Sequence, residues 1–304
     1  MKSALIIGFG SIGARHAQVL TDRGMLVSAA TSNPQCNYPK FQTVDAALAA
    51  SKPDLVVVCN ETSRHIETLK RLDECGYAGT VLVEKPLANR TPPVRKWPFA
   101  DIFVAYNLRF HPVIQALRRA LAAEKVISAH IYVGQYLPDW RPERDYRQSY
   151  SARRDMGGGV LRDLSHELDY ALWLFGNWRR VAAIGGHFSR LEIDSDDAWA
   201  VLMQLERCPM LTLQMNYLDR TSRREILVNT ETHSYRADLV GCTLQGTDSE
   251  QRFACELDTT YRLQMEALLS GHRTDLCSFA EGARVVELIH RIEEAAAAGK
   301  WAAA

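Results

Sequence analysis

Short apolar runs alternate with amphipathic segments over about the first hundred residues. The apolar runs have the length and continuity of parallel strands that are buried on both faces. They cover residues 4–7, 25–30, 54–59, 80–83 and 101–105. Segments with helical spacing of their apolar positions lie between them, at 11–23, 44–50 and 62–75. This alternation predicts an α/β domain with a doubly wound parallel sheet over residues 1–108.

Prolines crowd the segment between the last two of these strands. They are Pro86, Pro92, Pro93 and Pro98. Because proline lacks an amide N–H and its ring clashes with the preceding turn, this density excludes a long helix. We therefore expect an irregular connection where a crossover helix would normally lie.

The pattern changes after about residue 110. Helical spacing returns at 112–124, 160–175, 259–270 and 278–297. Short strand patterns with polar turns cover 126–135, 181–185, 198–206, 211–217, 225–229 and 234–239. The polar segment 137–155 is expected to be a long loop, and the tail 295–304 is expected to be frayed. These patterns predict a second, α+β domain over 109–304 with an antiparallel or mixed sheet.

Composition narrows the class of protein. The 304 residues contain 47% hydrophobic and 24% charged residues, and Lys+Arg equals Asp+Glu at 36 each. This balance gives no electrostatic reason to expect nucleic acid or a membrane as a partner. No apolar run reaches the roughly 18 residues of a membrane span. The first run is too short for a signal peptide and enters a glycine turn, so we predict a first strand and a cytoplasmic protein.

The chain has seven cysteines, an odd number, and no pair has CxxC spacing. They are Cys36, Cys59, Cys75, Cys208, Cys242, Cys255 and Cys277. Several lie in apolar strand or helix patterns, so free, buried thiols are expected. Disulfides or a zinc site are the alternative.

A glycine motif follows the first strand and opens the first helix. Gly8, Gly10 and Gly13 have the GxGxxG spacing, with Ser11 and Ile12 between them. Such glycines let the backbone approach a pyrophosphate, and the helix N-terminus supplies amide groups and a positive dipole end. These five residues are predicted to bind a dinucleotide. The alternative is a glycine turn that serves packing alone.

The second strand ends without the carboxylate that normally holds the ribose 2′-hydroxyl of NAD. Thr31, Ser32 and Asn33 stand there, and we expect them to contact the cofactor. Loss of the carboxylate removes repulsion of a 2′-phosphate, which favours NADP. Lys40 is the nearest downstream cation. An NAD enzyme that has lost the acid is the alternative.

The loop after the third strand carries further candidates for cofactor binding. Asn60 and Thr62 could contact ribose or nicotinamide, because this loop lies at the carboxyl edge of the sheet. His65 is a candidate as well, although it also suits the start of a helix.

An acid and an imidazole follow a run of three glycines. Asp163 and His166 are three residues apart after the glycines at 157–159, which predicts one helix face for both. Imidazole titrates near neutral pH, so this pair suits proton transfer. In the alternative, His166 belongs to the core and Asp163 braces the helix.

Aromatic and arginine residues gather in the loop at 137–155 and just before it. Tyr136, Trp140, Arg141 and Arg147 could stack on a sugar ring or bind an anionic group. Neighbouring acids offset much of the charge, so a surface loop with internal salt bridges is the alternative. Asn107 and Arg109, at the junction between the expected domains, are further candidates for substrate contact.

Four segments together resemble the Gfo/Idh/MocA oxidoreductases, named for glucose–fructose oxidoreductase and inositol dehydrogenase. They are GFGSIGARH at 8–16, Glu84-Lys85-Pro86, YNLRFHP at 106–112, and the segment 157–176 with its HELD core. The resemblance implies a Rossmann domain followed by a domain with a large open, mostly antiparallel sheet. It also implies NAD(P)-linked chemistry on sugars or polyols, and a homodimer or homotetramer formed through the sheet.

The resemblance also assigns roles. Lys85 is the lysine expected near the nicotinamide and the reacting hydroxyl, and Glu84 beside it is expected to contact the cofactor as well. Pro86 would fix the turn, for which a cis bond would serve. His166 is the expected proton carrier and Asp163 its partner. The family commonly spaces this pair four residues apart, whereas here the spacing is three, which weakens the assignment of Asp163.

The sequence therefore predicts an NAD(P)-dependent oxidoreductase. Hydride would pass between nicotinamide and a secondary alcohol or ketone of a sugar, sugar acid or nucleotide sugar. No metal is expected in the site. The alternatives are a free-polyol dehydrogenase of the same fold, or a sensor or scaffold protein that binds dinucleotide without turnover.

Overall fold

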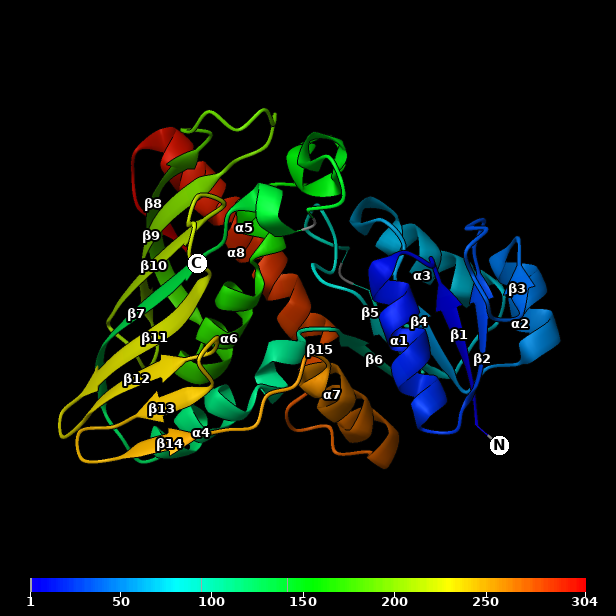
Figure 1. The fold of residues 1–304 in the computed structure, drawn as a ribbon, viewed down its shortest axis with the longest axis horizontal. Helices are drawn as coiled ribbons and strands as arrows, with labels where there is room; N and C mark the ends of the chain where they lie inside the picture. Colours follow the sequence, from blue (N-terminus) through cyan, green and yellow to red (C-terminus); the bar gives the residue numbers. More distant parts are fainter. Residues whose placement is uncertain (1, 94, 141) are drawn as a thin grey trace. The chain divides into compact units, whose positions relative to one another are not determined.

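The computed structural model describes residues 2–93, 95–140 and 142–304 (Figure 1). The chain forms two compact units. The first comprises Met1–Asn107 and Thr260–Val286, and the second comprises Leu108–Thr259 and Glu287–Ala304. Among the described residues, no helix combines the length and apolar character that a membrane span requires.

The first unit contains the predicted doubly wound sheet. Its seven strands run in the order β15-β6-β5-β4-β1-β2-β3. All neighbours are parallel except β15, which pairs antiparallel with β6. The strands are β1 (Ser3–Ile7), β2 (Leu26–Ala30), β3 (Lys40–Phe41), β4 (Leu55–Val58), β5 (Thr80–Val83), β6 (Asp101–Val104) and β15 (Cys277–Ser278). The two-residue strands β3 and β15 are too short to produce an apolar pattern, so the sequence did not reveal them.

The burial of the other five strands explains why the sequence pattern predicted them. Every side chain of β4 is buried, and so is most of β1, because helices cover both faces of a parallel sheet. The helices near the expected positions are α1 (Ser11–Asp22), α2 (Val44–Ser51) and α3 (His65–Glu74).

A late segment of the chain completes the first unit. Helix α7 (Thr259–Ser270) packs against α1, where the rings of His16 and Tyr261 meet edge-to-face with centroids 5.4 Å apart. Arg23 also donates to the Arg262 carbonyl at 2.8 Å. These contacts join Thr260–Val286, which the hydrophobic pattern had placed with the C-terminal part, to the first unit.

The proline-rich connection is irregular, as expected. No helix occurs between β5 and β6 in residues 84–93 and 95–100. Aromatic packing orders its end, because Trp97 and Phe99 stack with centroids 5.7 Å apart and planes 8° from parallel. A crossover helix is therefore replaced by proline and aromatic contacts.

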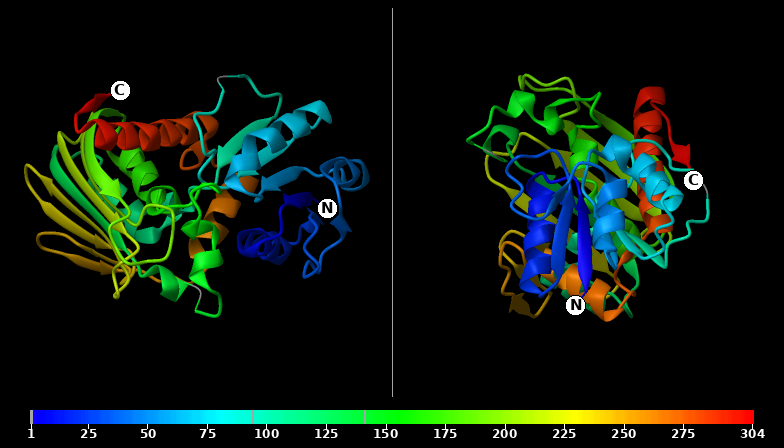
Figure 2. Two further views of the ribbon diagram at one scale, coloured as in Figure 1. Left: turned by 90° about the horizontal axis from the view of Figure 1, so that it is seen from above. Right: turned by 90° about the vertical axis from the view of Figure 1, so that its right-hand side faces the viewer.

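The second unit is built on a nine-stranded, mostly antiparallel sheet. Its order is β14-β13-β12-β11-β7-β10-β9-β8-β16, and only β7 and β10 are parallel neighbours. The strands are β7 (Val126–Gly134), β8 (Trp178–Gly186), β9 (Ala198–Leu205), β10 (Met210–Asn216), β11 (Arg223–Thr230), β12 (Ser234–Asp238), β13 (Thr243–Gln245), β14 (Glu250–Arg252) and β16 (Ala302–Ala303). Figure 2 shows helices on one face of this sheet and none on the other.

Cross-strand register separates the two faces. One row lies beneath the helices and contains the half-buried Ala183 and the buried Val201, Leu213, Ile131, Ile226 and Ala237. The row one residue along faces the open side and contains Ala182, Leu202, Thr212, His130 and Leu227. Because strand side chains alternate between faces, the single register fixes both rows.

The helix expected at 160–175 is two helices, which corrects the sequence interpretation. Helix α5 (Val160–Asp163) ends at Asp163 with Leu164 as its C-cap, and α6 (His166–Phe175) begins after Ser165. The amides of Ser165 and Glu167 bond to carbonyls three residues back instead of four, so the backbone turns between the helices. Asp163 and His166 therefore do not share one helix face.

The C-terminal tail is also ordered by tertiary contacts, contrary to the expected fraying. Helix α8 (Phe279–Ala298) is followed by β16, which pairs antiparallel with β8. The Arg180 guanidinium lies 4.7 Å from the centre of the Trp301 ring. Main-chain hydrogen bonds and this stacking order a tail whose alanine-rich sequence gives no sign of a strand. Helix α4 (Pro112–Ala120) completes the second unit.

Candidate functional site

The glycine motif forms a tight turn between β1 and α1. Gly8 has φ +89°, and a Cβ there would lie 2.6 Å from the Asn60 amide nitrogen. A Cβ on Gly13 would lie 2.2 Å from the Gly8 carbonyl oxygen. A Cβ on Gly10, by contrast, would meet no atom within 4 Å. Gly8 and Gly13 are thus required by packing, whereas Gly10 borders open space.

This arrangement fits the pyrophosphate of a dinucleotide. Gly10 is the N-cap of α1, where no side chain caps the helix, and Ser11 and Ile12 are its first two residues. An anion at this end would meet the amide groups and the positive end of the helix dipole. The open space beside Gly10 leaves room for such a group.

The end of β2 is tied to the glycine turn. The Asn33 side-chain amide donates to the Phe9 carbonyl at 2.6 Å, and the Asn33 backbone N–H donates to Thr31 Oγ1 at 3.0 Å. Ser32 lies exposed between them. Strand β3 brings Lys40 beside this turn, with Nζ 3.5 Å from the Asn33 carbonyl oxygen.

Asn60 presents a buried acceptor in the loop after β4. Its side-chain nitrogen donates to Thr68 Oγ1 at 2.8 Å, while Oδ1 is buried and has no hydrogen-bond partner. A buried oxygen of this kind is costly unless a ligand or water donates to it. Asn60 therefore fits contact with the ribose or nicotinamide. Thr62 is buried at the start of a 3₁₀ turn.

The structure places His65 among backbone groups. Its Nδ1 lies 3.2 Å from the Pro86 carbonyl oxygen, and its Nε2 lies 3.1 Å from that of Asn60. Burial lowers the pKa of His65 although these carbonyls oppose the shift, so the ring is neutral near pH 7. In this position His65 braces the Asn60 loop against the turn after β5.

Glu84, Lys85 and Pro86 form that turn, and the Lys85–Pro86 bond is cis, as expected for it. His16 of α1 donates from Nε2 to Glu84 Oε1 at 2.8 Å, and the Lys85 amide donates to Glu84 Oε2 at 3.0 Å. Burial would raise the pKa of Glu84, but the His16 hydrogen bond and the His16 and Lys85 charges outweigh it and hold the pKa below its usual range. The carboxylate thus anchors the turn that presents Lys85.

His16 is a functional candidate that the sequence analysis did not single out. It is fully buried, and it joins α1, which carries the glycine turn, to the turn that carries Lys85. Its place within the family-like GFGSIGARH segment was the available signal, but a histidine on an apolar helix face usually belongs to the core.

In the second unit, Asp163 is bonded to the sheet. Tyr217, directly after β10, donates its hydroxyl to Asp163 Oδ2 at 2.6 Å. Burial, together with the Asp163 charge, raises the pKa of Tyr217 well above its usual range, so Tyr217 remains a donor. His166 is half-buried at the first position of α6. Nothing in the Asp163–His166 spacing pointed to Tyr217, which lies 54 residues after Asp163 in the chain.

The run of three glycines packs against its own unit instead of forming a flexible loop. A Cβ on Gly158 would lie 2.1 Å from the Tyr150 carbonyl oxygen, and one on Gly159 would lie 2.2 Å from Asp196 Oδ1. Asp196 Oδ2 accepts from the Leu161 amide at 3.0 Å and therefore caps α5. Gly158 and Gly159 are thus explained by chain packing.

Two residues proposed for substrate contact are bound inside their units. Arg109 is 2% exposed and forms a two-pronged ion pair with Asp169, with Nη2 to Oδ1 at 2.7 Å and Nε to Oδ2 at 2.9 Å. Asn107 is buried and donates to Thr260 Oγ1 at 2.8 Å. These contacts give both residues a structural function in this conformation.

The aromatic residues of the loop that follows β7 lie near Asp163. Trp140 meets Tyr217 edge-to-face with centroids 5.2 Å apart, and its buried Nε1 has no hydrogen-bond partner. Tyr136 lies under the Arg220 guanidinium, 3.4 Å from the ring centre. An unsatisfied buried N–H beside aromatic faces suits a ligand with hydroxyl or carbonyl acceptors.

The arginines of this loop show a different arrangement. Arg147 forms two salt bridges, from Nε to Asp145 Oδ1 and from Nη1 to Glu192 Oε2, both at 2.8 Å. This is the arrangement expected for the alternative, a surface loop with internal salt bridges. Arg141 lies outside the described residues.

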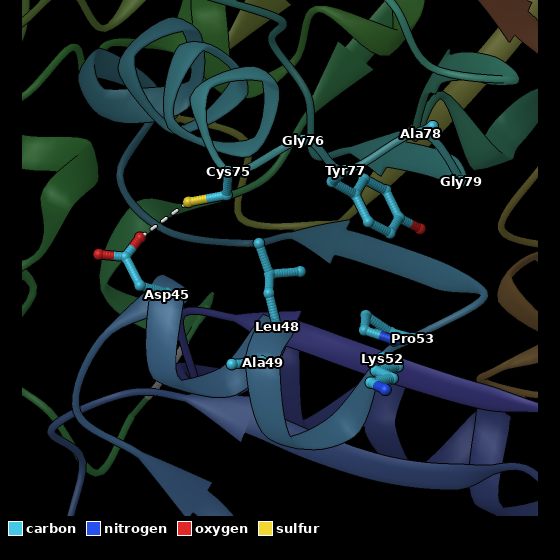
Figure 3. A pocket seen from close by; sticks show the side chains of 10 residues that line it. All are labelled: Asp45, Leu48, Ala49, Lys52, Pro53, Cys75, Gly76, Tyr77, Ala78 and Gly79. Carbon is cyan, nitrogen blue, oxygen red and sulfur yellow. Dashed lines mark hydrogen bonds between the residues drawn. The ribbon is translucent and has the colours of Figure 1, made fainter.

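A hollow of about 560 Å³ lies elsewhere in the first unit (Figure 3). Its lining includes Asp45 and Leu48 of α2 and the segment from Cys75 to Gly79 before β5. This is the amino-terminal edge of the sheet, opposite the glycine turn. Dinucleotides bind at the carboxyl edge, so this hollow is not the candidate cofactor site.

Comparison with known proteins adds the family. Residues 2–96 match a model described as the oxidoreductase family with an NAD-binding Rossmann fold, and residues 114–236 match the GFO/IDH/MocA C-terminal domain. An inositol 2-dehydrogenase from Rhizobium meliloti (strain 1021) is 27% identical over 187 residues. This match covers 56% of the chain and 54% of the relative, so it spans about half of that protein's length.

Solved structures share the fold over the whole chain. Levoglucosan dehydrogenase in complex with NADH has a TM-score of 0.84 at 16% identity, covering 99% of this chain and 98% of that one. The WlbA dehydrogenase from Bordetella pertussis, in complex with NADH and UDP-GlcNAcA, has a TM-score of 0.79 at 17% identity, covering 100% and 99%. At these identities the likeness concerns the fold alone. The two matching models describe successive parts of one family of proteins, in the same order as here, and the chain therefore belongs to the Gfo/Idh/MocA oxidoreductase family.

Proposed function

We propose that this protein is an NAD(P)-dependent oxidoreductase that interconverts a secondary alcohol and a ketone on a sugar, sugar acid or nucleotide sugar. Residues 1–108 would bind the dinucleotide, and residues 109–304 would bind the substrate. The main support for this proposal is the arrangement of three groups in the first unit. The glycine turn, the Asn60 acceptor and Lys85 lie at the carboxyl ends of neighbouring strands β1, β4 and β5 and are joined through His16 and His65.

Lys85 and His166 would handle the proton. When bound, the nicotinamide supplies or accepts the hydride. The Lys85 ammonium would polarise the reacting oxygen, and Glu84 would hold its turn in place. His166 would take the proton from an alcohol, or return it to a carbonyl in the reverse direction. Asp163, bonded to Tyr217, would orient the groups around this histidine.

The substrate class is proposed from the second unit. Aromatic faces at Tyr136 and Trp140 suit a sugar ring, and the unsatisfied Trp140 Nε1 would donate to a hydroxyl or carbonyl oxygen. The relatives support this class, since inositol, levoglucosan and a UDP-sugar appear in the names of proteins that resemble this chain. Arg147 is paired with Asp145 and Glu192, so an anionic substrate would have to displace these carboxylates to bind it.

The coenzyme is proposed to be NADP, with NAD as the alternative. The turn after β2 has no carboxylate, and Lys40 stands beside Asn33, where a 2′-phosphate would extend. A charge-assisted contact of this kind contributes about 1.5–3 kcal/mol, which corresponds to at least about tenfold in affinity. NAD is favoured by the family model and by the NADH complexes of the relatives.

The first experiment is a fluorescence titration of the protein with NADH and with NADPH, using its 6 tryptophans as energy donors. The protein should bind NADPH more tightly than NADH. Lys40→Ala should lower the affinity for NADPH by about tenfold and leave the affinity for NADH unchanged. An equal loss of affinity for both coenzymes would show that Lys40 does not bind the 2′-phosphate. Binding of neither by folded protein would contradict the proposed function.

The second experiment separates catalysis from coenzyme binding. Lys85→Met and His166→Ala should abolish turnover on an active sugar substrate while coenzyme affinity stays nearly constant. Lys70→Met and His272→Ala change exposed residues of the same types and are the matched controls. Full activity in both site variants would refute the assignment. Coenzyme binding with no turnover of a broad sugar and polyol panel would favour a sensor or scaffold.

A further inference from the structure

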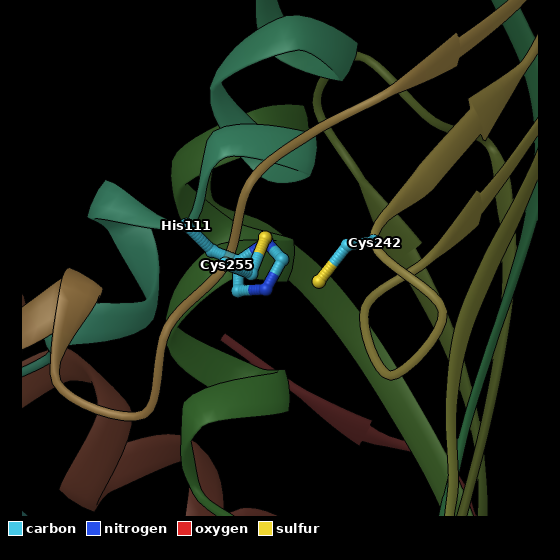
Figure 4. A group of neighbouring side chains, drawn as sticks. All are labelled: His111, Cys242 and Cys255. Atoms are coloured by element: carbon cyan, nitrogen blue, oxygen red, sulfur yellow. The ribbon is translucent and has the colours of Figure 1, made fainter.

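Three side chains that commonly bind metals converge at one end of the large sheet. They are His111, the N-cap of α4, Cys242, directly before β13, and Cys255, three residues after β14. One imidazole nitrogen and the two Sγ atoms all lie within 4.8 Å of one another. Figure 4 shows the Cys255 thiol against the His111 ring, with the Cys242 thiol pointing toward both. We propose that these residues form a zinc site.

The distances suit a small rearrangement into a tetrahedral site. Zinc lies about 2.3 Å from thiolate sulfur and about 2.0–2.1 Å from imidazole nitrogen, so its ligand atoms stand roughly 3.3–3.8 Å apart. A contraction of about 1 Å therefore suffices. Two sulfurs and one nitrogen favour zinc over magnesium or calcium, and water would fill the fourth position.

The backbone at Cys242 supports a functional reason for this residue. Cys242 has φ +55°, in the left-handed region that few residues other than glycine and asparagine occupy. Asp238 Oδ1 holds the turn by accepting from the amides of Val240 at 3.0 Å and Gly241 at 2.8 Å. An uncommon conformation that the surrounding turn maintains often marks a site where the side chain is needed.

His111 is buried and held in one orientation. It is 7% exposed, and its Nδ1 accepts from the Val113 amide at 3.3 Å. The Arg224 cation and the Leu239 carbonyl lie near the ring. Arg224 is itself paired with buried Glu167, with Nε to Oε1 at 2.8 Å. On binding through Nε2, the imidazole proton would move to Nδ1 in place of the Val113 hydrogen bond, and the two thiols would form Zn–S bonds and release two protons.

The two cysteines flank the β13–β14 hairpin. The Cys242 carbonyl accepts from the Phe253 amide at 2.9 Å, which brings the end of the hairpin that carries Cys255 beside Cys242. A disulfide between these thiols is the competing outcome, and the experiment below distinguishes it from a zinc site.

The test uses the full chain, reduced and treated with a chelator, with Zn²⁺ alone as the probe. We expect one zinc per chain by competition with a chromophoric chelator, a higher Tm, and two fewer thiols reacting with a thiol reagent. Co²⁺ should give thiolate-to-metal charge-transfer absorption and the visible bands of a tetrahedral ion. Magnesium should change none of these readouts.

Variants then locate the site. Cys242→Ser, Cys255→Ser and His111→Asn should each weaken zinc binding by more than the roughly 10–100-fold typical of losing an outer contact. Asparagine can still cap α4. Cys36→Ser, a half-buried cysteine in the first unit, is the control and should bind zinc as the wild type does.

Three results would overturn the proposal. The first is no zinc uptake by reduced wild-type protein, and the second is unchanged affinity in all three variants. The third is a Cys242–Cys255 disulfide in protein isolated without reductant, with no zinc bound after reduction. None of these measurements depends on coenzyme binding or turnover, so this proposal and the proposed function can fail independently.

Discussion

At the scale of single residues, Glu84 shows how a buried charge can hold a functional turn. Its two oxygens bind different groups, His16 Nε2 at 2.8 Å and the Lys85 amide at 3.0 Å. The side chain is only 12% exposed, so each contact is made where water competes little. Sequence comparison by motif identified Lys85, but the residue that braces its turn became visible only through the contact with α1.

This contact predicts a dependence of stability on pH. The pKa of Glu84 is lowered in the folded protein, so ionisation of Glu84 stabilises the fold above the ordinary value of 4.5, and this contribution is lost as pH falls through the folded pKa. Glu84→Gln should lower the urea midpoint at pH 7, at a cost of about 1.5–3 kcal/mol for the charged hydrogen bond. Urea titrations across acidic pH should show wild type and variant converging below 4.5. A constant gap over that range would disprove the assigned role.

At the scale of elements, the start of α1 combines two kinds of glycine. Gly8 and Gly13 are there because the neighbouring backbone leaves no room for a Cβ, whereas a Cβ on Gly10 would meet nothing within 4 Å. The GxGxxG spacing alone does not separate these roles, since it shows three equal glycines. The separation comes from the packing of the β1–α1 turn against the Asn60 loop.

This difference predicts two distinct phenotypes. Gly10→Ala should keep the thermal stability of the wild type but weaken NADH and NADPH binding, because its methyl group would occupy the space proposed for the pyrophosphate. Gly13→Ala should lower Tm, since its Cβ would lie 2.2 Å from the Gly8 carbonyl oxygen. Calorimetry and coenzyme titration on both variants are the measurements. If Gly10→Ala binds both coenzymes as well as the wild type does, the pyrophosphate does not bind at this end of α1.

The helix expected at 160–175 is divided into α5 and α6 by contacts that its own sequence does not indicate. Its apolar spacing continues through Leu164, so periodicity gave no reason to divide it. The division follows from contacts distant in sequence: Asp196 caps the first part, and Tyr217 binds Asp163 at its end. Local spacing cannot report such partners, because they come from strands and loops that follow later in the chain.

At the scale of the whole molecule, the face of the large sheet that no helix covers exposes apolar side chains. Apolar side chains are exposed on it, including Ile184 at 73%, Met210 at 55%, Leu227 at 39% and Leu202 at 37%. Exposed apolar patches on a regular sheet commonly mark a protein interface. We therefore propose that this face forms a homodimer or homotetramer.

Charge introduced on this face should disrupt the assembly. Leu202→Asp combined with Leu227→Asp places two carboxylates in one cross-strand row, and desolvating them at an interface costs several kcal/mol. Light scattering after size exclusion should give a dimer or tetramer for the wild type and a monomer for the double variant. Leu257→Asp, at an 83% exposed position in a loop, is the control. A monomeric wild type would eliminate this interface.

The sequence by itself determined five strands of the first unit (β1, β2, β4, β5 and β6), its helices α1 to α3 and its glycine turn. It also determined the irregular proline-rich connection and an antiparallel or mixed sheet in the second unit. These features depend on local periodicity, on proline and glycine geometry, and on the continuous apolar runs that double-sided burial requires. The GxGxxG spacing and the Asp163–His166 spacing brought the glycines and His166 forward as candidates, whereas Lys85 came from the resemblance to the family.

Only the tertiary structure decided which side chains those candidates contact. It paired Glu84 with His16, Arg109 with Asp169 and Asp163 with Tyr217, and it brought Cys242 and Cys255 to His111. It also ordered the tail through β16 and broke the helix at Leu164. Each of these outcomes depends on residues far apart in sequence, whose meeting is set by sheet order and register and leaves no local pattern.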